Sequence, residues 1–145
     1  MEIQITTIPP SDAILEVFEQ QHPITLRWGL KVKKATIKHP RAKFFYLLED
    51  GIYVGEIILG FLDKTRMNVD GLTVLREYQG RGYGRQLLKH AMTYTKSEGF
   101  EAMTAVARDG ASCKLFVSEG FEIRAKISDW AGLNEPPYYS VGLIF

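Results

Sequence analysis

The sequence contains only one cysteine, Cys113, among its 145 residues. This count excludes an intrachain disulfide and a metal site built from several cysteines, and it is typical of a reducing compartment. Charge of one sign is not in excess either, because 18 Lys and Arg residues stand against 17 Asp and Glu residues, for a net charge of +1. That balance provides no overall electrostatic attraction to nucleic acid.

Long hydrophobic runs are also missing. The longest, such as residues 57–62, are far shorter than the ~20 residues that span a bilayer. Residues 1–6 have neither the basic start nor the long apolar core of a signal peptide. The chain length, the 46% of hydrophobic residues and the absence of linkers or repeats predict a single soluble, cytoplasmic domain over residues 1–145.

The hydrophobic pattern predicts strands and helices around a single sheet, so we expect a mixed α/β or α+β domain. Strands are expected at residues 2–8, 44–48, 52–62, 68–75, 101–107, 121–128 and 138–145. Helices are expected at residues 14–18, within 24–38, from 84 to a stop at Gly99, and around 113–117, the last capped by Asp109. Gly55 and Gly60 indicate a bulge or a close approach of the backbone within a strand.

A glycine-rich turn at residues 80–84 joins a predicted strand directly to a predicted helix. Backbone N–H groups at such a junction lie at the positive end of the helix dipole, where they can bind a phosphate group. The spacing excludes a dinucleotide fingerprint, because the sixth residue counted from Gly80 is Arg85 and that counted from Gly82 is Leu87. A P-loop is excluded too, and the alternative is a turn that only lets the helix pack closely on its strand.

The segment Gln79-Gly80-Arg81-Gly82-Tyr83-Gly84 resembles the Gln/Arg-x-x-Gly-x-Gly/Ala signature of the GNAT superfamily, the acetyl-CoA-dependent N-acetyltransferases. Residues 72–78 are similar to the strand and turn that precede this signature, and residues 115–121 resemble a downstream segment of the family that ends in Gly-Phe. The order of elements matches over nearly the whole chain. The resemblance implies a mostly antiparallel central sheet, flanked by helices and splayed at a cofactor cleft.

By this resemblance, acetyl-CoA is the acetyl donor and no metal takes part. Backbone amides of the glycine-rich turn would bind the pyrophosphate, and the preceding strand would pair with the pantetheine arm, where a strand amide could stabilise an oxyanion. The implied cofactor-binding residues are Leu72, Thr73, Val74, Gln79, Gly80, Arg81, Gly82, Tyr83, Gly84, Arg85 and Phe116.

The residues that often carry protons in this family are replaced. Phe116 stands at the position of the usual tyrosine, Thr104 at that of a glutamate base, and Asp109 at that of an asparagine. Asp70 is the best remaining candidate for a catalytic carboxylate, and we expect it on the same strand face as Leu72. Its alternative role is that of a solvated aspartate at a strand end or in a turn.

Several aromatic and histidine residues have two open interpretations. Tyr83, Tyr138 and Tyr139 could replace the missing acid or serve only in packing. Trp28 and Trp130, with the same tyrosines at 138 and 139, could line an acceptor pocket or belong to the core. The three histidines, His22, His39 and His90, are expected to be structural or at the surface. Cys113 is expected to be a small buried hydrophobe.

The stretch between Glu19 and Glu49 has no acidic residue, and its positions 27, 31, 34 and 38 predict one basic helical stripe. The stripe is either a solvated helix face or a surface that attracts an anionic acceptor or partner. Residues 141–145 either cover the domain's own core or join a dimer sheet.

These patterns together predict an N-acetyltransferase in which a small-molecule or peptide amine attacks acetyl-CoA directly in a ternary complex, without nucleic acid or membrane partners. The alternative is an acyl-CoA-binding regulatory or partner-binding domain that has lost turnover. The replacements at Phe116 and Thr104 favour that alternative.

Overall fold

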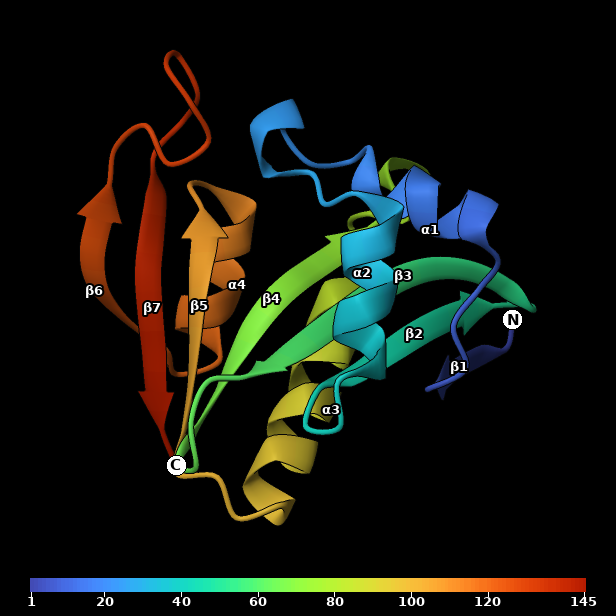
Figure 1. The fold of residues 1–145 in the computed structure, drawn as a ribbon, viewed down its shortest axis with the longest axis horizontal. Helices are drawn as coiled ribbons and strands as arrows, with labels where there is room; N and C mark the ends of the chain where they lie inside the picture. Colours follow the sequence, from blue (N-terminus) through green and yellow to red (C-terminus); the bar gives the residue numbers. More distant parts are fainter.

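The computed structural model describes all residues from Met1 to Phe145. Four α-helices and seven strands follow the predicted order, with two short 3₁₀ turns between them (Figure 1). The strands are β1 (Ile3–Thr6), β2 (Lys43–Glu49), β3 (Ile52–Phe61), β4 (Arg66–Val74), β5 (Ala102–Arg108), β6 (Glu122–Ile127) and β7 (Tyr138–Ile144). The helices are α1 (Asp12–Glu19), α2 (Leu30–Lys38), α3 (Tyr83–Ser97) and α4 (Ala111–Ser118), and the 3₁₀ turns are η1 (Ile24–Leu26) and η2 (Arg76–Tyr78).

All seven strands form one sheet in the order β1-β2-β3-β4-β5-β7-β6. Every neighbouring pair is antiparallel except β4 and β5, which run parallel. The expected mixed, mostly antiparallel sheet with flanking helices is confirmed. None of the helices has the length and apolar character needed to cross a membrane.

The sheet is splayed between β4 and β5. Their parallel pairing begins at Arg66 and ends at the pair Val69 and Ala105. β4 then continues to Val74 and β5 to Arg108 without hydrogen bonds to each other, and the two strands diverge visibly in Figure 1. The second half of β4 therefore keeps β3 on one side and has no strand on the other.

The two faces of the sheet are covered differently. The main hydrophobic core lies under α3 and α4 and contains Leu87 and Leu88 of α3 and Phe116 of α4. A smaller cluster of Leu15, Phe18 and Tyr46 lies under α1 on the other face. β7 is paired on both sides, by β5 and β6, so residues 141–144 lie within the chain's own sheet.

A β-bulge in β4 determines which way Asp70 faces. Val69 pairs with Leu59 and Gly71 pairs with Ile58, so Asp70 is an extra residue without a partner on β3. The extra residue shifts the alternation of side chains by one position. Before the bulge, Met67 and Val69 point to the main core, and after it Leu72 and Val74 do so. The prediction that Asp70 shares a face with Leu72 is wrong, and Asp70 points to the face of α1 and α2.

Two further expectations need correction. α4 begins after Gly110 without any side-chain cap, so Asp109 does not cap it. Arg27 lies before α2 and its guanidinium donates to the carbonyl oxygens of His22 and Gln20, so it does not extend the basic stripe. The glycine prediction is confirmed, since a Cβ at Gly55 would lie only 2.9 Å from Leu87 Cδ1.

Candidate active site

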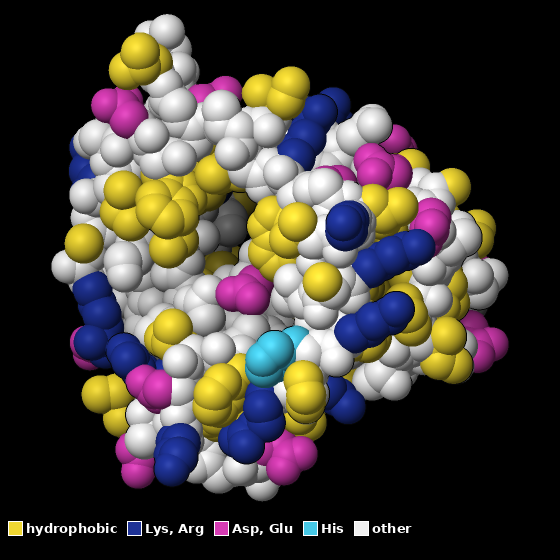
Figure 2. All heavy atoms as spheres, viewed as in Figure 1, with side chains coloured by type: hydrophobic (Ala, Val, Ile, Leu, Met, Phe, Trp, Pro, Cys, Tyr) yellow, Lys and Arg dark blue, Asp and Glu magenta, His cyan; other side chains and the backbone are white.

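A cavity of about 420 Å³ lies where β4 and β5 part. Its walls come from β3, β4 and β5, from the segment between α1 and α2, from α4, and from the loop between β6 and β7. Figure 2 shows the hollow on the face of the molecule that carries α2, with hydrophobic side chains around it and acidic atoms at its edge. The splaying of the sheet therefore creates space that reaches from one face to the other.

The glycine-rich turn presents free backbone donors at the start of α3. Gly80 and Gly82 adopt φ angles of +81° and +82°, a left-handed conformation that glycine adopts without strain. No backbone N–H of residues 80–85 donates a hydrogen bond within the chain. Six consecutive donors at the positive end of a 15-residue helix are thus free to bind an anion.

The side chains of this turn hold its shape and are already paired. Arg81 Nη1 donates to Glu49 Oε1 at 2.8 Å, and the buried Tyr83 hydroxyl donates to the same oxygen. Arg85 Nη1 donates to Glu119 Oε2 at 2.8 Å, at the end of α4. The backbone amides, rather than these side chains, are the groups left without a partner.

The end of β4 has one edge open to the cavity. Leu72, Thr73 and Val74 pair with β3 on their other edge, and all three line the cavity. Gln79 Nε2 donates to Val74 O at 2.9 Å, which fixes the turn to the end of the strand. Phe116 closes the cavity from α4 with its ring edge-on to Phe121, at 5.0 Å between centroids.

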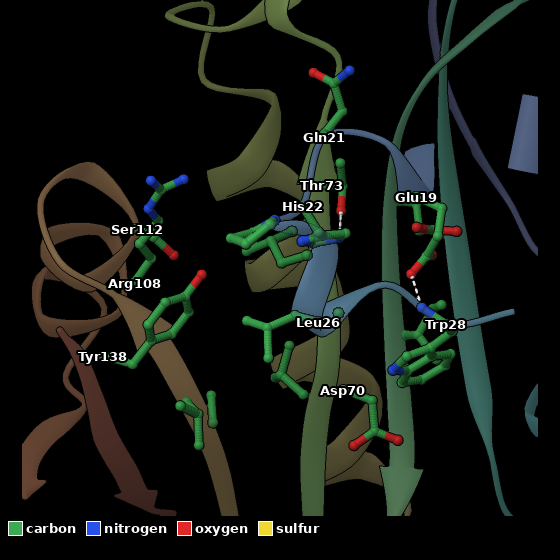
Figure 3. Close-up of a pocket in the computed structure, with 18 of the residues that line it drawn as sticks. Glu19, Gln21, His22, Leu26, Trp28, Asp70, Thr73, Arg108, Ser112 and Tyr138 are labelled. Carbon is green, nitrogen blue, oxygen red and sulfur yellow. Dashed lines mark hydrogen bonds between the residues drawn. The ribbon is translucent and has the colours of Figure 1, made fainter. Parts of the chain in front are cut away.

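Asp70 is an exposed residue that lines this space, and Figure 3 shows it next to Trp28. Asn68 Nδ2 donates to its carboxylate at 2.8 Å, and no cation contacts it. The enclosing walls remove part of the hydration of the carboxylate, which raises the pKa of Asp70 above its usual range. A carboxylate of raised pKa without a cationic partner can accept a proton.

A buried charge cluster supports the neighbouring wall. Lys33 of α2 is only 1% exposed, and its Nζ lies 3.2 Å from Glu19 Oε2 and 2.9 Å from Glu56 Oε1. Burial raises the pKa of Glu56 to about 7, although Lys33 opposes that shift. Glu19 also accepts the backbone N–H of Trp28. The cluster therefore fixes the segment between α1 and α2 to the sheet.

His22 is a residue of the cavity that the sequence predicts only as structural or at the surface. Its Nε2 is joined to Thr73 Oγ1 by a 2.8 Å hydrogen bond, and the ring lines the cavity (Figure 3). Burial lowers the pKa of His22, so the ring is neutral near pH 7. No spacing in the sequence indicates this contact, because it joins residues that are 51 positions apart.

Some of the aromatic candidates line the cavity in the structure, and others lie outside it. Trp28, Trp130 and Tyr138 line the cavity, whereas Tyr139 does not. Burial raises the pKa of Tyr138, so its hydroxyl keeps its proton at neutral pH. Tyr83 is occupied with Glu49, outside the cavity, and cannot supply an acid there.

Cys113 is buried, as expected, and burial raises the pKa of its thiol. His39 and His90 are not among the residues of the cavity. Thr104 Oγ1 donates to Asn68 Oδ1 at 2.7 Å and so acts on Asp70 only through Asn68.

Comparison with known families gives the class of the protein, that of an acetyltransferase family. The model of the acetyltransferase (GNAT) family matches residues 10–121, so the chain belongs to this family. The resemblance found in the sequence is thereby confirmed. A search of curated protein sequences finds no match.

Solved structures share the fold at low sequence identity. The ribosomal-protein-S18-alanine N-acetyltransferase from Escherichia coli is 19% identical at a TM-score of 0.82, over 99% of this chain and 94% of that chain. The protein yncA from Salmonella typhimurium, solved with its cofactor acetyl-CoA, is 17% identical at a TM-score of 0.81, over 99% and 94%. An IAA acetyltransferase from Bacillus cereus is 17% identical at a TM-score of 0.78, over 99% and 100%. The expected cofactor, acetyl-CoA, is thus one that is bound in structures of this fold.

Proposed function

We propose that the protein is an N-acetyltransferase in which an acceptor amine directly attacks acetyl-CoA bound beside it. One observation carries the proposal: six unpaired backbone donors at residues 80–85 adjoin an open strand edge at residues 72–74. A diphosphate attached to an extended amide chain has the chemistry that matches both features. Family membership supports the same conclusion.

The residues on this path fit the parts of acetyl-CoA. The amides from Gly80 to Arg85 would hold the pyrophosphate, and the open edge at Leu72–Val74 would pair with the amides of the pantetheine arm. Phe116 would pack against the arm where it enters the cavity. When bound there, acetyl-CoA supplies a thioester whose carbonyl carbon forms a bond to the acceptor nitrogen while its bond to sulfur breaks.

Asp70 is the proposed proton acceptor. A free alkylamine has a pKa near ~10, so the acceptor arrives as an ammonium ion and must lose a proton before it can attack. Asp70 has no competing cation, and the raised pKa makes its carboxylate a better base than an aspartate of ordinary pKa. Its position on the wall of the cavity lets it hold the ammonium group and then take its proton.

Tyr138 is the proposed proton donor. Its hydroxyl lies across the gap from Asp70 in Figure 3, on the β5 side of the cavity. The raised pKa of Tyr138 keeps its hydroxyl protonated, so it can donate a hydrogen bond to the leaving thiolate, which needs only modest help because the thiol pKa is about 8.5. Tyr138 would therefore provide the acid that Phe116 cannot.

Release of free thiol from acetyl-CoA tests the proposal directly. The protein is incubated with acetyl-CoA and a panel of amines, amino acids, polyamines and peptide N-termini, and thiol is measured against a no-acceptor control. We expect thiol release that depends on one class of acceptor. Tight binding of acetyl-CoA with no release from any acceptor would instead favour a regulatory acyl-CoA-binding domain.

A further inference from the structure

More than half of the residues that line the cavity are not hydrophobic. Only 11 of the 24 lining residues are hydrophobic. The polar ones include Asn68 and Thr73 of β4, Ser112 of α4, and Gln21 from the segment between α1 and α2. A pocket with polar groups on several walls selects a ligand by the polar groups that the ligand itself carries.

The charged residues of the walls consist of a closed cluster and two separate groups. Lys33 is 1% exposed and is enclosed by Glu19 and Glu56, so a ligand cannot reach its charge. The two that remain are Asp70 and Arg108. They carry opposite charges, and no ion pair joins them. The cavity therefore presents one negative and one positive group to a ligand.

Asp70 and Arg108 face the same side of the sheet, from the two strands that part. Ala107 of β5 is buried in the main core, so the next residue, Arg108, faces α1 and α2, as Asp70 does. The pairing of β5 with β7 runs to Arg108 without a shift of register, so the alternation is not broken. In Figure 3, Arg108 lies with Tyr138 on one side of the cavity and Asp70 lies on the other.

The backbones of the two residues are well separated. The last pair between β4 and β5 is Val69 and Ala105, and Asp70 is one residue beyond that pair whereas Arg108 is three beyond it. At about 3.3 Å per residue, this difference separates them by about 6–7 Å along the strands. The strands also diverge here (Figure 1), so their sideways separation exceeds the ~4.8 Å of paired strands. This leaves room for a ligand that contacts both side chains.

Arg108 is only loosely held by the protein. Its Nη2 lies 3.7 Å from Glu135 Oε2, beyond hydrogen-bond distance, and the two side chains are 45% and 38% exposed. Exposed pairs of this kind contribute little, because water solvates both charges and screens their attraction. An anion on a ligand can replace Glu135 and accept two parallel hydrogen bonds from the planar guanidinium. Arg108 is thus available to an anionic group.

We propose that the acceptor carries an anionic group as well as its amine, and that Arg108 binds this group while Asp70 binds the ammonium group. This inference rests on the proposed function and adds the substrate class. An acceptor with a positive charge alone would leave Arg108 without a ligand partner, and an anion without an amine would be repelled by Asp70. A molecule with both charges satisfies both residues. A free amino acid has this chemistry, and so does a polypeptide N-terminus that is followed by an acidic side chain.

Matched pairs of acceptors test the anionic group. Binding of acetyl-CoA is first measured by calorimetry, and kcat/KM is then compared for 4-aminobutyrate with butylamine and for phenylalanine with 2-phenylethylamine. The third pair is a pentapeptide amide with glutamate at its second position and the same peptide with glutamine there. We expect the anionic member of at least one pair to exceed its neutral partner by about tenfold or more. Because two pairs represent amino acids and one represents a polypeptide, the pair that shows the preference identifies the source.

Variants of Arg108 assign the preference to this residue. We expect Arg108→Gln to lower kcat/KM for the preferred anionic acceptor by about tenfold or more, through a higher KM, without changing the neutral partner or the Kd for acetyl-CoA. Arg108→Lys should retain part of the preference, because it keeps the charge. Glu135→Gln removes the competing carboxylate and should lower the KM for the same acceptor. Arg124→Gln is the matched control, because Arg124 lies on β6 and does not line the cavity.

The outcomes separate this inference from the proposed function. If the neutral member is equal or better in every pair, or if no probe is acetylated by protein that binds acetyl-CoA, the substrate class is wrong while the coenzyme site stands. A preference that survives in Arg108→Gln would overturn the inference. A weaker Kd for acetyl-CoA in that variant would also overturn it, because Arg108 would then belong to the coenzyme site. If acetyl-CoA does not bind to the unchanged protein, the proposed function itself fails.

Discussion

The carboxylate of Asp70 occupies the space in which a side chain at Gly60 would begin. Gly60 is on β3 and pairs with Asn68, the residue that donates a hydrogen bond to Asp70. The lack of a side chain at Gly60 on β3 leaves room for the carboxylate, and the bulge in β4 directs it over the sheet and into the cavity. Both features serve to position a single group.

Gly60→Ala therefore tests how Asp70 is positioned. The added Cβ would overlap the carboxylate and displace it, so we expect kcat to fall about tenfold or more while the Kd for acetyl-CoA is unchanged. Gly71→Ala is the matched control, because its nearest side-chain neighbour, Ile58 Cδ1, would be 4.0 Å away. Equal kcat values for the two variants would show that the position of Asp70 is unimportant.

Asp70→Asn tests the proton acceptor itself. The substitution removes the base, so we expect kcat to fall by about 10² or more with little change in the binding of acetyl-CoA. Because burial raises the pKa of Asp70, the rate of the unchanged protein should fall as the pH drops through that raised pKa. That acid limb should be absent from the pH–rate profile of the variant, and an unaltered profile would remove Asp70 from the mechanism.

Stability should respond to Asp70→Asn in the opposite direction from activity. A carboxylate of raised pKa is less stable as an anion in the folded chain than in the unfolded one, so at neutral pH it lowers the free energy of unfolding. The asparagine variant should have an equal or higher Tm. A marked loss of Tm would mean that the carboxylate is structural.

Lys33→Met and Lys34→Met compare a buried with an exposed ion pair. Lys33 is 1% exposed and pairs with Glu19 and Glu56, whereas Lys34 is 46% exposed and pairs with Asp12. Loss of Lys33 leaves two buried carboxylates without a cation, and we expect the free energy of unfolding to fall by about 3–5 kcal/mol. Loss of Lys34 should change it by less than about 1 kcal/mol. Urea unfolding measures both, and equal effects would contradict the buried cluster.

Glu56→Gln tests the pH dependence of stability. The pKa of Glu56 is about 7 in the folded chain, against an ordinary value of 4.5. Between those values the folded chain holds a proton that the unfolded chain has lost, so the contribution of Glu56 to stability decreases as the pH rises. The variant lacks that contribution. Between pH 5 and pH 7, a window that spans this pKa shift of ~2 units, its free energy of unfolding should therefore change less than that of the unchanged protein. Parallel pH curves for both proteins would contradict the assignment.

Much of the fold follows from local sequence patterns. The alternation of apolar residues and the turn at residues 49–51 predict the hairpin of β2 and β3, and the helical period from residue 84 predicts α3. The glycine-rich turn and its signature predict the family. These signals lie within short stretches of chain, so a single sequence contains them.

The rest of the site depends on contacts between distant residues. The bulge that turns Asp70 away from the face of Leu72 exists only in the pairing of β4 with β3. In the sequence, Lys33 is one of several lysines of a basic helix. Its burial results from the packing of α2 on the sheet, which no local pattern indicates. The hydrogen bond between Thr25 and Ala131 joins residues that are 106 positions apart, and no local pattern indicates it.

The central claim is that the backbone donors of residues 80–85 bind the diphosphate of a CoA thioester. Gly82→Glu places an anion at that site, and Gly51→Glu matches it because Gly51 has the same φ of +82° and open space in the turn between β2 and β3. Calorimetry with acetyl-CoA compares the two variants with the unchanged protein. We predict one saturable site with a micromolar Kd for the unchanged protein and Gly51→Glu, and a Kd at least about 100-fold weaker for Gly82→Glu. No binding to the unchanged protein, or equal binding to all three, would contradict the account.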